Sequence, residues 1–269
     1  MRKARLFGFL AGGALAGAWA VKNKLEKLAP SVPVVDDDTV LLFQFDYSPY
    51  CVKVRHILEY KQIPFQTVEV TPLLHRAFSK RFSGQVKVPY IQHKGQIICD
   101  SSQIALYLET EFPEPALLPA DPKLREEVLL LEDWLDESFV PALSRPVYVS
   151  SYLNPLPLIQ NPNLSTGIAA LDRFKPQIVP LMLRRNMRIQ GLTPADLPKL
   201  EDRAQEVLDR AQKLVADKEY LVGESLSLAD ISLVAHLFNA DKLPLLGQSE
   251  TYRPLLKWRE RRLAEIQPA

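Results

Sequence analysis

The spacing of apolar residues changes once along the chain, and this change separates two regions of different predicted structure. Between residues 40 and 112, apolar runs of strand length alternate with stretches of helical spacing. The pattern predicts the order β-α-β-α-β-β-α, with elements at residues 40–45, 52–60, 65–70, 73–82, 86–91, 96–99 and 103–112. We therefore expect a mixed α/β domain over residues 40–112.

The second region, residues 123–269, has helical spacing throughout. Helices are predicted at residues 124–140, 168–189, 197–216, 228–238 and 252–264, which indicates an all-α C-terminal domain. Residues 113–122 contain four prolines without periodicity, so we expect a semi-rigid linker there. The strongest helix start is Ser227-Leu228-Ala229-Asp230, which has capping-box spacing, with Leu226 and Ile231 at the positions of a hydrophobic staple.

The first 22 residues form a separate segment. Three basic residues lie within the first five positions, and the 16 residues from 6 to 21 are uncharged. As a helix this stretch would measure about 24 Å, against about 30 Å for a bilayer core. We expect residues 1–22 to be a membrane anchor, followed by a tether at residues 23–39. A cleaved signal peptide is the alternative, because Ala-Trp-Ala at 18–20 fits a cleavage site, and an organelle presequence ranks third.

Charge and cysteine content limit the possible partners, metal sites and cellular compartment of the protein. The chain has 269 residues with 33 basic and 32 acidic side chains, so its charge gives no case for a nucleic-acid partner. Two basic clusters, at 184–188 and 253–262, are interpreted as solvated helix faces. The four histidines lack metal-ligand spacing, so no metal site is predicted. Cys51 and Cys99 alone make no disulfide framework, which favours a reducing compartment.

The segment Tyr47-Ser48-Pro49-Tyr50-Cys51 lies between the first predicted strand and the first predicted helix. Ser48 suits the N-cap, Pro49 the first helical position, and Cys51 lies in the first turn. A helix N-terminus carries a partial positive charge that favours a nearby thiolate. The layout indicates a thiol-handling site, although Ser-Pro is also an ordinary way to start a helix.

Two further segments can bind a ligand through the backbone. Pro89 lies inside a predicted strand, where it removes a ladder donor and belongs at an edge, a bulge or a cis bond. A cis bond would leave the backbone of Val88 free to pair with a ligand. Asp100-Ser101-Ser102 opens the next predicted helix, so a second helix N-terminus with a carboxylate beside it can hold a small charged group.

These segments and their order resemble a known family. S-P-Y-C after the first strand, V-P before the third and D-S after the fourth resemble the thioredoxin-like domain of the glutathione S-transferase superfamily over residues 40–112. The sequence LVGESLSLAD at 221–230 resembles the folding signature of that family's helical domain. The resemblance implies a thioredoxin-like α/β domain followed by an all-α domain, glutathione as the bound thiol, and a homodimer.

The same resemblance implies roles for individual residues. Ser48 would support the glutathione thiolate, as the catalytic residue of a serine-type site. Other matching positions would bind the cysteinyl unit, the γ-glutamyl end and the glycyl carboxylate of glutathione; these are, in turn, Val88 with Pro89, Asp100 with Ser101, and Lys87. The family often has Glu where this chain has Asp100.

A second nucleophile is available in Cys51. Glutaredoxins carry C-P-Y-C, and in their dithiol mechanism the first cysteine attacks; here Ser48 replaces it, which favours conjugation over disulfide reduction. Cys51 can have a lowered pKa in the first helical turn or can point into the core. The N-terminal segment, S-P-Y-C and residues 68–72 also resemble, more distantly, the membrane-associated type 2 prostaglandin E synthases, whose motif begins with cysteine.

We therefore expect a transferase that holds the glutathione thiolate against a small apolar electrophile. Two alternatives stay open: a non-catalytic, membrane-tethered adaptor with the same fold, and a glutathione-dependent thiol oxidoreductase or isomerase acting through Cys51. Glutathione chemistry favours a membrane-anchored protein with its catalytic domain on the cytoplasmic side, whereas a cleaved signal would export it. Basic residues flank the apolar segment on both sides, so charge does not choose the side.

Overall fold

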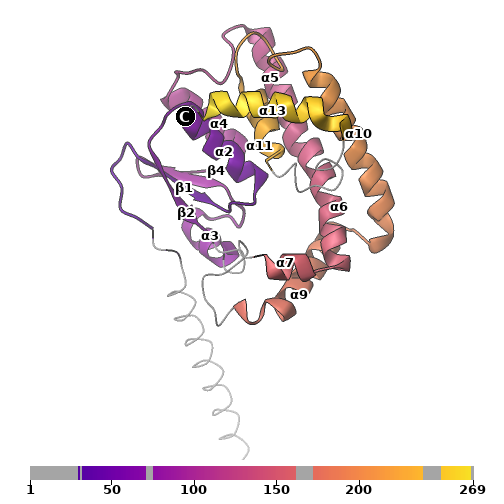
Figure 1. The fold of residues 1–269 in the computed structure, drawn as a ribbon. Coiled ribbons are helices and arrows are strands. Elements are labelled where there is room, and N and C mark those ends of the chain that lie inside the picture. The colour runs from indigo at the N-terminus through magenta and orange to yellow at the C-terminus, as the bar shows by residue number, and fades with distance from the viewer. Residues whose placement is uncertain (1–29, 31, 71–74, 162–171, 239–249, 268–269) are drawn as a thin grey trace, which may run out of the picture.

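A four-stranded mixed sheet lies at the centre of the N-terminal half (Figure 1). The computed structural model describes residues 30, 32–70, 75–161, 172–238 and 250–267. β1 (Val40–Gln44) is parallel to β2 (Phe65–Glu69) and antiparallel to β3 (Tyr90–His93), which pairs with the edge strand β4 (Gln96–Cys99). Helices α2 (Pro49–Tyr60), α3 (His75–Ser83) and α4 (Ser101–Glu111) complete this half, and the predicted element order is confirmed.

Both faces of β1 are covered, because consecutive side chains of a strand point to opposite faces. Val40 and Leu42 belong to the larger apolar core, which includes residues of α2, α4 and the C-terminal helices. Leu41 and Phe43 belong to a second core on the other face, where α3 packs. The C-terminal helices therefore cover the α2 and α4 side of the sheet.

The described residues of the C-terminal half are helical, which confirms the predicted all-α domain. Its α-helices are α5 (Pro122–Trp134), α6 (Val140–Leu153), α7 (Leu156–Gln160), α9 (Lys175–Ile189), α10 (Leu197–Val215), α11 (Leu228–His236) and α13 (Arg253–Ile266). A π-helical turn, η1 (Leu135–Phe139), joins α5 to α6, and two 3-10 turns, η3 (Pro194–Asp196) and η5 (Glu250–Tyr252), precede α10 and α13. Every residue of α11 is buried, and this helix packs against α2 (Figure 1).

Several predicted boundaries are wrong. The strand expected at residues 86–91 begins only at Tyr90, because Pro89 has no N–H to donate to a ladder and the chain before it is irregular. The helix expected to end at residue 140 continues through η1 into α6 and ends at Leu153. The short helix α7 was not predicted, and of the helix expected at 168–189 the residues 168–171 lie outside the described ranges.

The linker at residues 113–121 is packed against the sheet domain. The Glu109 carboxylate accepts hydrogen bonds from the buried Leu117 and Leu118 N–H groups at 2.9–3.1 Å. Lys61 lies 2.8 Å from the same carboxylate and donates to the Phe112 carbonyl at 2.6 Å. The connection between the domains is thus fixed by buried hydrogen bonds and an ion pair.

The predicted membrane anchor, residues 1–22, lies outside the described residues. Of the predicted tether, Val32 and Val35 pack on the second core together with residues of α3. The chain therefore enters the folded body on the α3 side of the sheet. Among the described residues, no helix combines the length and the apolar character that crossing a membrane requires.

Candidate active site

The strand register brings the three predicted ligand-binding segments to one end of the sheet. Phe43 of β1 pairs with Tyr90 of β3, which pairs in turn with Cys99 of β4. β1 and β4 therefore end, and β3 begins, at the same end of the sheet. The three segments predicted to bind a ligand extend from this end of the sheet, at Ser48, at Val88–Pro89 and at Asp100–Ser101.

Ser48 is the N-cap residue of α2, and Pro49 follows it as the first helical residue, as predicted. The Ser48 side chain makes no capping bond to the helix backbone and instead hydrogen-bonds the Cys51 thiol. Its backbone is fixed, because its N–H donates to the Phe45 carbonyl at 2.8 Å and its carbonyl accepts from Val52 at 3.0 Å. The half-buried hydroxyl is thus held at the positive end of α2.

Cys51 points into the core. Its side chain is fully buried, and the Phe45 N–H donates to Sγ at 3.4 Å. Burial raises the pKa of the Cys51 thiol to about 11, and the hydrogen bond from Ser48 only partly opposes this effect. The sequence left two alternatives for Cys51, a thiol with a lowered pKa or a side chain in the core. The structure has the second. At pH 7 the thiolate fraction would be roughly one in 10⁴.

The Val88–Pro89 peptide bond is cis, and β3 starts directly after it. Val88 is half-buried and forms no backbone hydrogen bond to another described residue. Its N–H and carbonyl therefore remain available to a ligand that approaches the edge of the sheet. Lys87, beside it, is exposed.

Asp100 and Ser101 lie at the start of α4 but face in different directions. Asp100 is the exposed N-cap residue, and its Oδ1 accepts from the Ser102 and Gln103 N–H groups at 3.1 and 3.2 Å. Its φ of 75° is one that few residues other than glycine adopt. The Ser101 hydroxyl is buried and lies 3.4 Å from Asp136 Oδ2. Only Asp100 therefore presents its side chain at the surface.

A buried ionic cluster, missed by the sequence reasoning, lies where α2, α4 and α5 meet. The fully buried Lys53 places Nζ 2.5 Å from Glu132 Oε1 and 2.6 Å from Asp136 Oδ2. The Ser102 hydroxyl donates to Glu132 Oε1 at 2.5 Å. Because the two acids are four positions apart on a continuous helical path, one ammonium can bridge them. The cluster ties the two helix starts of the sheet domain to the helical domain.

His236 of α11 and Tyr50 of α2 complete this cluster at Asp136. His236 Nε2 lies 2.7 Å from Asp136 Oδ1, and the Tyr50 hydroxyl donates to the Asp136 carbonyl at 2.9 Å. Complete burial lowers the pKa of His236, so the ring is neutral at pH 7 and Nε2 holds the proton that faces the carboxylate. Burial alone would raise the pKa of Asp136, but the His236 hydrogen bond and the Lys53 charge outweigh it and lower the pKa to about 2.

The sequence carries only a weak signal for this cluster. Lys53 stands between Val52 and Val54 on a helix that packs into the core, and His236 ends an otherwise mostly apolar helix. A polar or charged residue on an apolar helix face is expected to have a buried partner, but the sequence does not identify that partner. The π-helical turn that carries Asp136 is a feature common near functional sites. Within the described ranges, no three His, Cys, Asp or Glu side chains are arranged to hold a metal ion.

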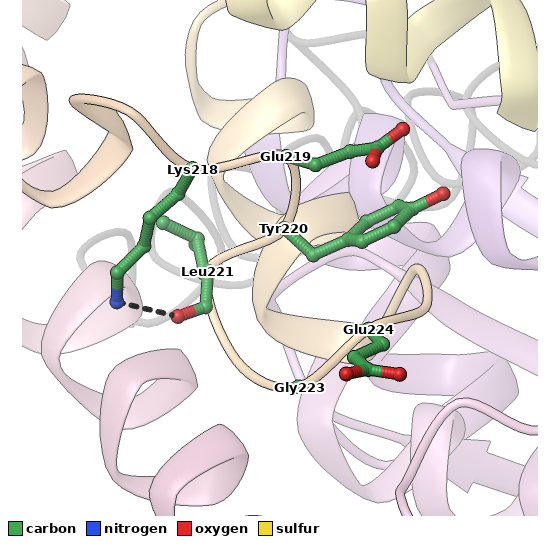
Figure 2. A pocket seen from close by; sticks show the side chains of 6 residues that line it. All are labelled: Lys218, Glu219, Tyr220, Leu221, Gly223 and Glu224. Atoms are coloured by element: carbon green, nitrogen blue, oxygen red, sulfur yellow. Dashed lines mark hydrogen bonds between the residues drawn. The ribbon is translucent and has the colours of Figure 1, made fainter.

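A surface hollow of about 520 Å³ lies elsewhere, at the loop between α10 and α11 (Figure 2). Lys218 donates to the Leu221 carbonyl at 3.2 Å, and the Leu221 N–H donates to the Asp230 carboxylate at 2.7 Å. These bonds shape the loop that leads into α11. None of the predicted site residues lines the hollow.

Comparison with known proteins gives matches in both halves of the chain. Residues 42–116 match the glutathione S-transferase N-terminal domain, and residues 169–261 match the glutathione S-transferase C-terminal domain. LigF of Sphingobium sp. strain SYK-6 is 33% identical over 106 residues, 38% of this chain and 41% of LigF. Prostaglandin E synthase 2 of Danio rerio is 32% identical over 108 residues, 38% of this chain and 28% of that protein. The matched segments span less than half of either relative.

Solved structures extend the likeness to both domains. The crystal structure of the β-etherase LigF covers 85% of this chain and 97% of its own, with a TM-score of 0.66 and 23% identity. Ure2p in complex with glutathione covers 87% of this chain and 98% of its own, with a TM-score of 0.62 and 15% identity. At these identities the likeness shows the fold. With matches to both of its domains and this shared fold, the chain belongs to the glutathione S-transferase superfamily.

Proposed function

We propose that this protein is a glutathione-dependent transferase with a serine-type site, which joins glutathione to a small apolar electrophile. The observation that carries the proposal is the meeting of Ser48, Val88–Pro89 and Asp100–Ser101 at one end of the sheet. The three segments are distant in sequence and each offers a different group: a hydroxyl at a helix N-terminus, free backbone, and a surface carboxylate. Together they suit a thiol tripeptide with charged ends.

In this mechanism the N-terminus of α2 and the Ser48 hydroxyl act on the sulfur of bound glutathione. The positive end of the helix lowers the thiol pKa. The Ser48 hydroxyl turns from the Cys51 thiol and donates its hydrogen bond to the glutathione thiolate. The sulfur attacks the electrophilic carbon, an S–C bond forms, and the leaving group departs with the electron pair of the broken bond. The thiol proton passes to solvent. The enzyme contributes by positioning both reactants and by raising the thiolate fraction.

A reaction through Cys51 is the weaker alternative. Its Sγ is fully buried, and the pKa of about 11 leaves little thiolate to attack a substrate. A thiol oxidoreductase or isomerase of this kind would need the first turn of α2 to open. The related prostaglandin E synthase 2 therefore informs the fold of this chain more than its chemistry.

The test is the rate of glutathione conjugation to an activated aryl halide by the full chain and its variants. Ser48→Ala should lower kcat/KM about 100-fold and raise the pH at which the rate is half-maximal, because the thiolate loses a hydrogen-bond donor. Ser48→Thr, which keeps the hydroxyl, should recover most of the rate. Cys51→Ala should leave the rate within a few-fold. Further electrophiles should include an ether, since LigF is described as a β-etherase.

Two outcomes would change the assignment. Loss of activity in Cys51→Ala alone would place the thiol chemistry on the protein. If no electrophile reacted while calorimetry still detected glutathione binding, the adaptor would become the leading function, because a relic of the fold can bind without turnover.

The proposal includes a setting: a homodimer anchored by residues 1–22 with its catalytic domain on the cytoplasmic side. Superfamily membership supports the dimer, and the uncharged N-terminal sequence supports the anchor. Sedimentation equilibrium tests the first. Protease protection in sealed vesicles, with N-terminal sequencing to detect signal cleavage and export, tests the second.

A further inference from the structure

We infer that the end of the helical domain formed by α7 and α9 docks on an anionic lipid membrane. This α7–α9 surface consists of three exposed apolar residues and three exposed arginines: Leu156, Leu181, Ile189, Arg184, Arg185 and Arg188. The inference concerns a different face from the candidate active site and does not depend on the proposed transferase activity.

The apolar members of this surface are exposed because α9 uses its opposite face for packing. Leu183 and Met187, one turn apart, are buried where α9 meets α6. Leu181 lies two positions from Leu183 and so points to the far side of the helix, where it is 67% exposed. Ile189 is 65% exposed and Leu156 of α7 is 55% exposed. Exposed apolar side chains on two helices that contact each other, α7 and α9, favour an interaction site at this end of the domain.

The charge of this region is strongly one-sided. Residues 146–192 contain five basic residues and one acidic residue, a net charge of +4, and α9 itself contains no acid. Residues 1–29 contain six basic residues and one acidic residue, a net charge of +5. Because the whole chain carries +1, the remaining residues must carry −8. The arginines at 184, 185 and 188 form no ion pair with another described residue, so their charge is available to a partner.

This combination favours lipid over other partners. Arginines interleaved with leucine and isoleucine on one exposed helix face are typical of helices that lie in the interface of an anionic bilayer. A nucleic acid would use the charges but would leave the aliphatic side chains in water. α7 and α9 also lie at the same end of the molecule as α3 (Figure 1), and Val32 packs on the core that α3 covers. The basic, apolar N-terminal sequence therefore joins the body at this end.

The experiment uses the full chain with Cys99→Ser and an environment-sensitive fluorophore at Leu181→Cys. Cys51 is fully buried and will not be labelled. The matched control carries the label at Leu130→Cys on α5, where Leu130 is 68% exposed, as Leu181 is at 67%. Each protein is mixed with vesicles of phosphatidylcholine alone or with about one third phosphatidylserine, and quenching by a nitroxide lipid is measured. A tethered but undocked protein would show no quenching at either label.

We expect quenching at residue 181 but not at residue 130, only with phosphatidylserine, and reversed at about 0.5 M salt. Replacing the three arginines, Arg184→Gln, Arg185→Gln and Arg188→Gln, should weaken docking about 100-fold, with circular dichroism confirming the fold. Equal signals at the two labels would overturn the inference. So would a label at 181 that is shielded without vesicles, which indicates a second copy of the chain, or one that responds to a soluble polyanion and not to lipid.

Discussion

Asp136, at the interface between the two domains, and Asp230, inside the helical domain, are both buried carboxylates with unlike partners. Asp136 faces the Lys53 ammonium at 2.6 Å and the His236 ring at 2.7 Å, and its pKa is lowered to about 2. Within the described part of the chain, the hydrogen-bond donors to Asp230 are neutral: the Leu221 N–H at 2.7 Å and the Ser227 N–H and hydroxyl at 2.9 and 2.6 Å. Burial raises the pKa of Asp230 in spite of these bonds.

The difference teaches what each site depends on. Three hydrogen bonds from neutral groups do not offset the cost of burying the charge of Asp230. At Asp136 the His236 hydrogen bond and the Lys53 charge together do. The Asp230 site is local, because the capping box lies within one turn of α11. The Asp136 site joins α2, η1 and α11, so the position of α2 depends on side-chain contacts between distant parts of the chain.

The largest effect should come from Lys53→Met. Removing the ammonium leaves Glu132 and Asp136 buried side by side without a cation, and we expect a loss of about 3–5 kcal/mol in the free energy of unfolding, measured by urea denaturation. Lys257→Met, at an exposed lysine of α13, is the matched control and should change stability by less than about 0.5 kcal/mol. A loss below about 1 kcal/mol at Lys53 would mean that water reaches the cluster.

Asp136→Asn and Asp230→Asn compare the two carboxylates directly. At position 136 the amide faces a cation, so we expect a loss of about 3 kcal/mol, against about 2 kcal/mol at position 230, where a neutral donor loses its acceptor. Combined with Lys53→Met, Asp136→Asn should cost at least about 1 kcal/mol less than the sum of the single losses. Asp230→Asn should be additive with Lys53→Met within about 0.5 kcal/mol. Additive behaviour of both pairs would contradict the cluster.

The same contrast explains what the sequence could predict. The starts of α2, α4 and α11 were predicted because Pro49, Asp100 and Ser227 act on their own first turns. The ionic cluster was not predicted, because Lys53 and His236 lie 83 and 100 positions from Asp136. Pairing across such distances depends on how the domains pack, and the π-helical turn that carries Asp136 has no sequence signature here. The candidate ligand-binding segments were found by resemblance, but only the strand register shows that they share one edge.

Acid should affect the two carboxylates in opposite directions. The pKa of Asp136 is lowered, so its contribution is present above the unfolded value near 3.8 and is lost as the pH falls through about 2; about 2 kcal/mol should disappear between pH 6 and pH 2, half of it by pH 3. The pKa of Asp230 is raised, so its contribution grows as the pH falls. Urea denaturation from pH 6 to pH 3 should therefore show a shallower decline for Asp136→Asn and a steeper one for Asp230→Asn. Parallel curves would refute both assignments.

The smallest effect should come from Tyr50→Phe. This substitution tests the contribution of a hydrogen bond to the backbone of η1, apart from the contribution of the ion pairs at Asp136. The Tyr50 hydroxyl donates its hydrogen bond to the Asp136 backbone carbonyl, at 2.9 Å, and not to the carboxylate, so its loss should cost about 1 kcal/mol. Tyr60→Phe, on the same helix, is the matched control, because its hydroxyl forms no hydrogen bond to another described residue. Since the ion pairs remain in Tyr50→Phe, its stability should fall by the same amount at pH 6 and pH 3. A loss that shrinks toward acid would show that Tyr50 also stabilises the charged carboxylate of Asp136, and the contrast between Asp136 and Asp230 would then include Tyr50.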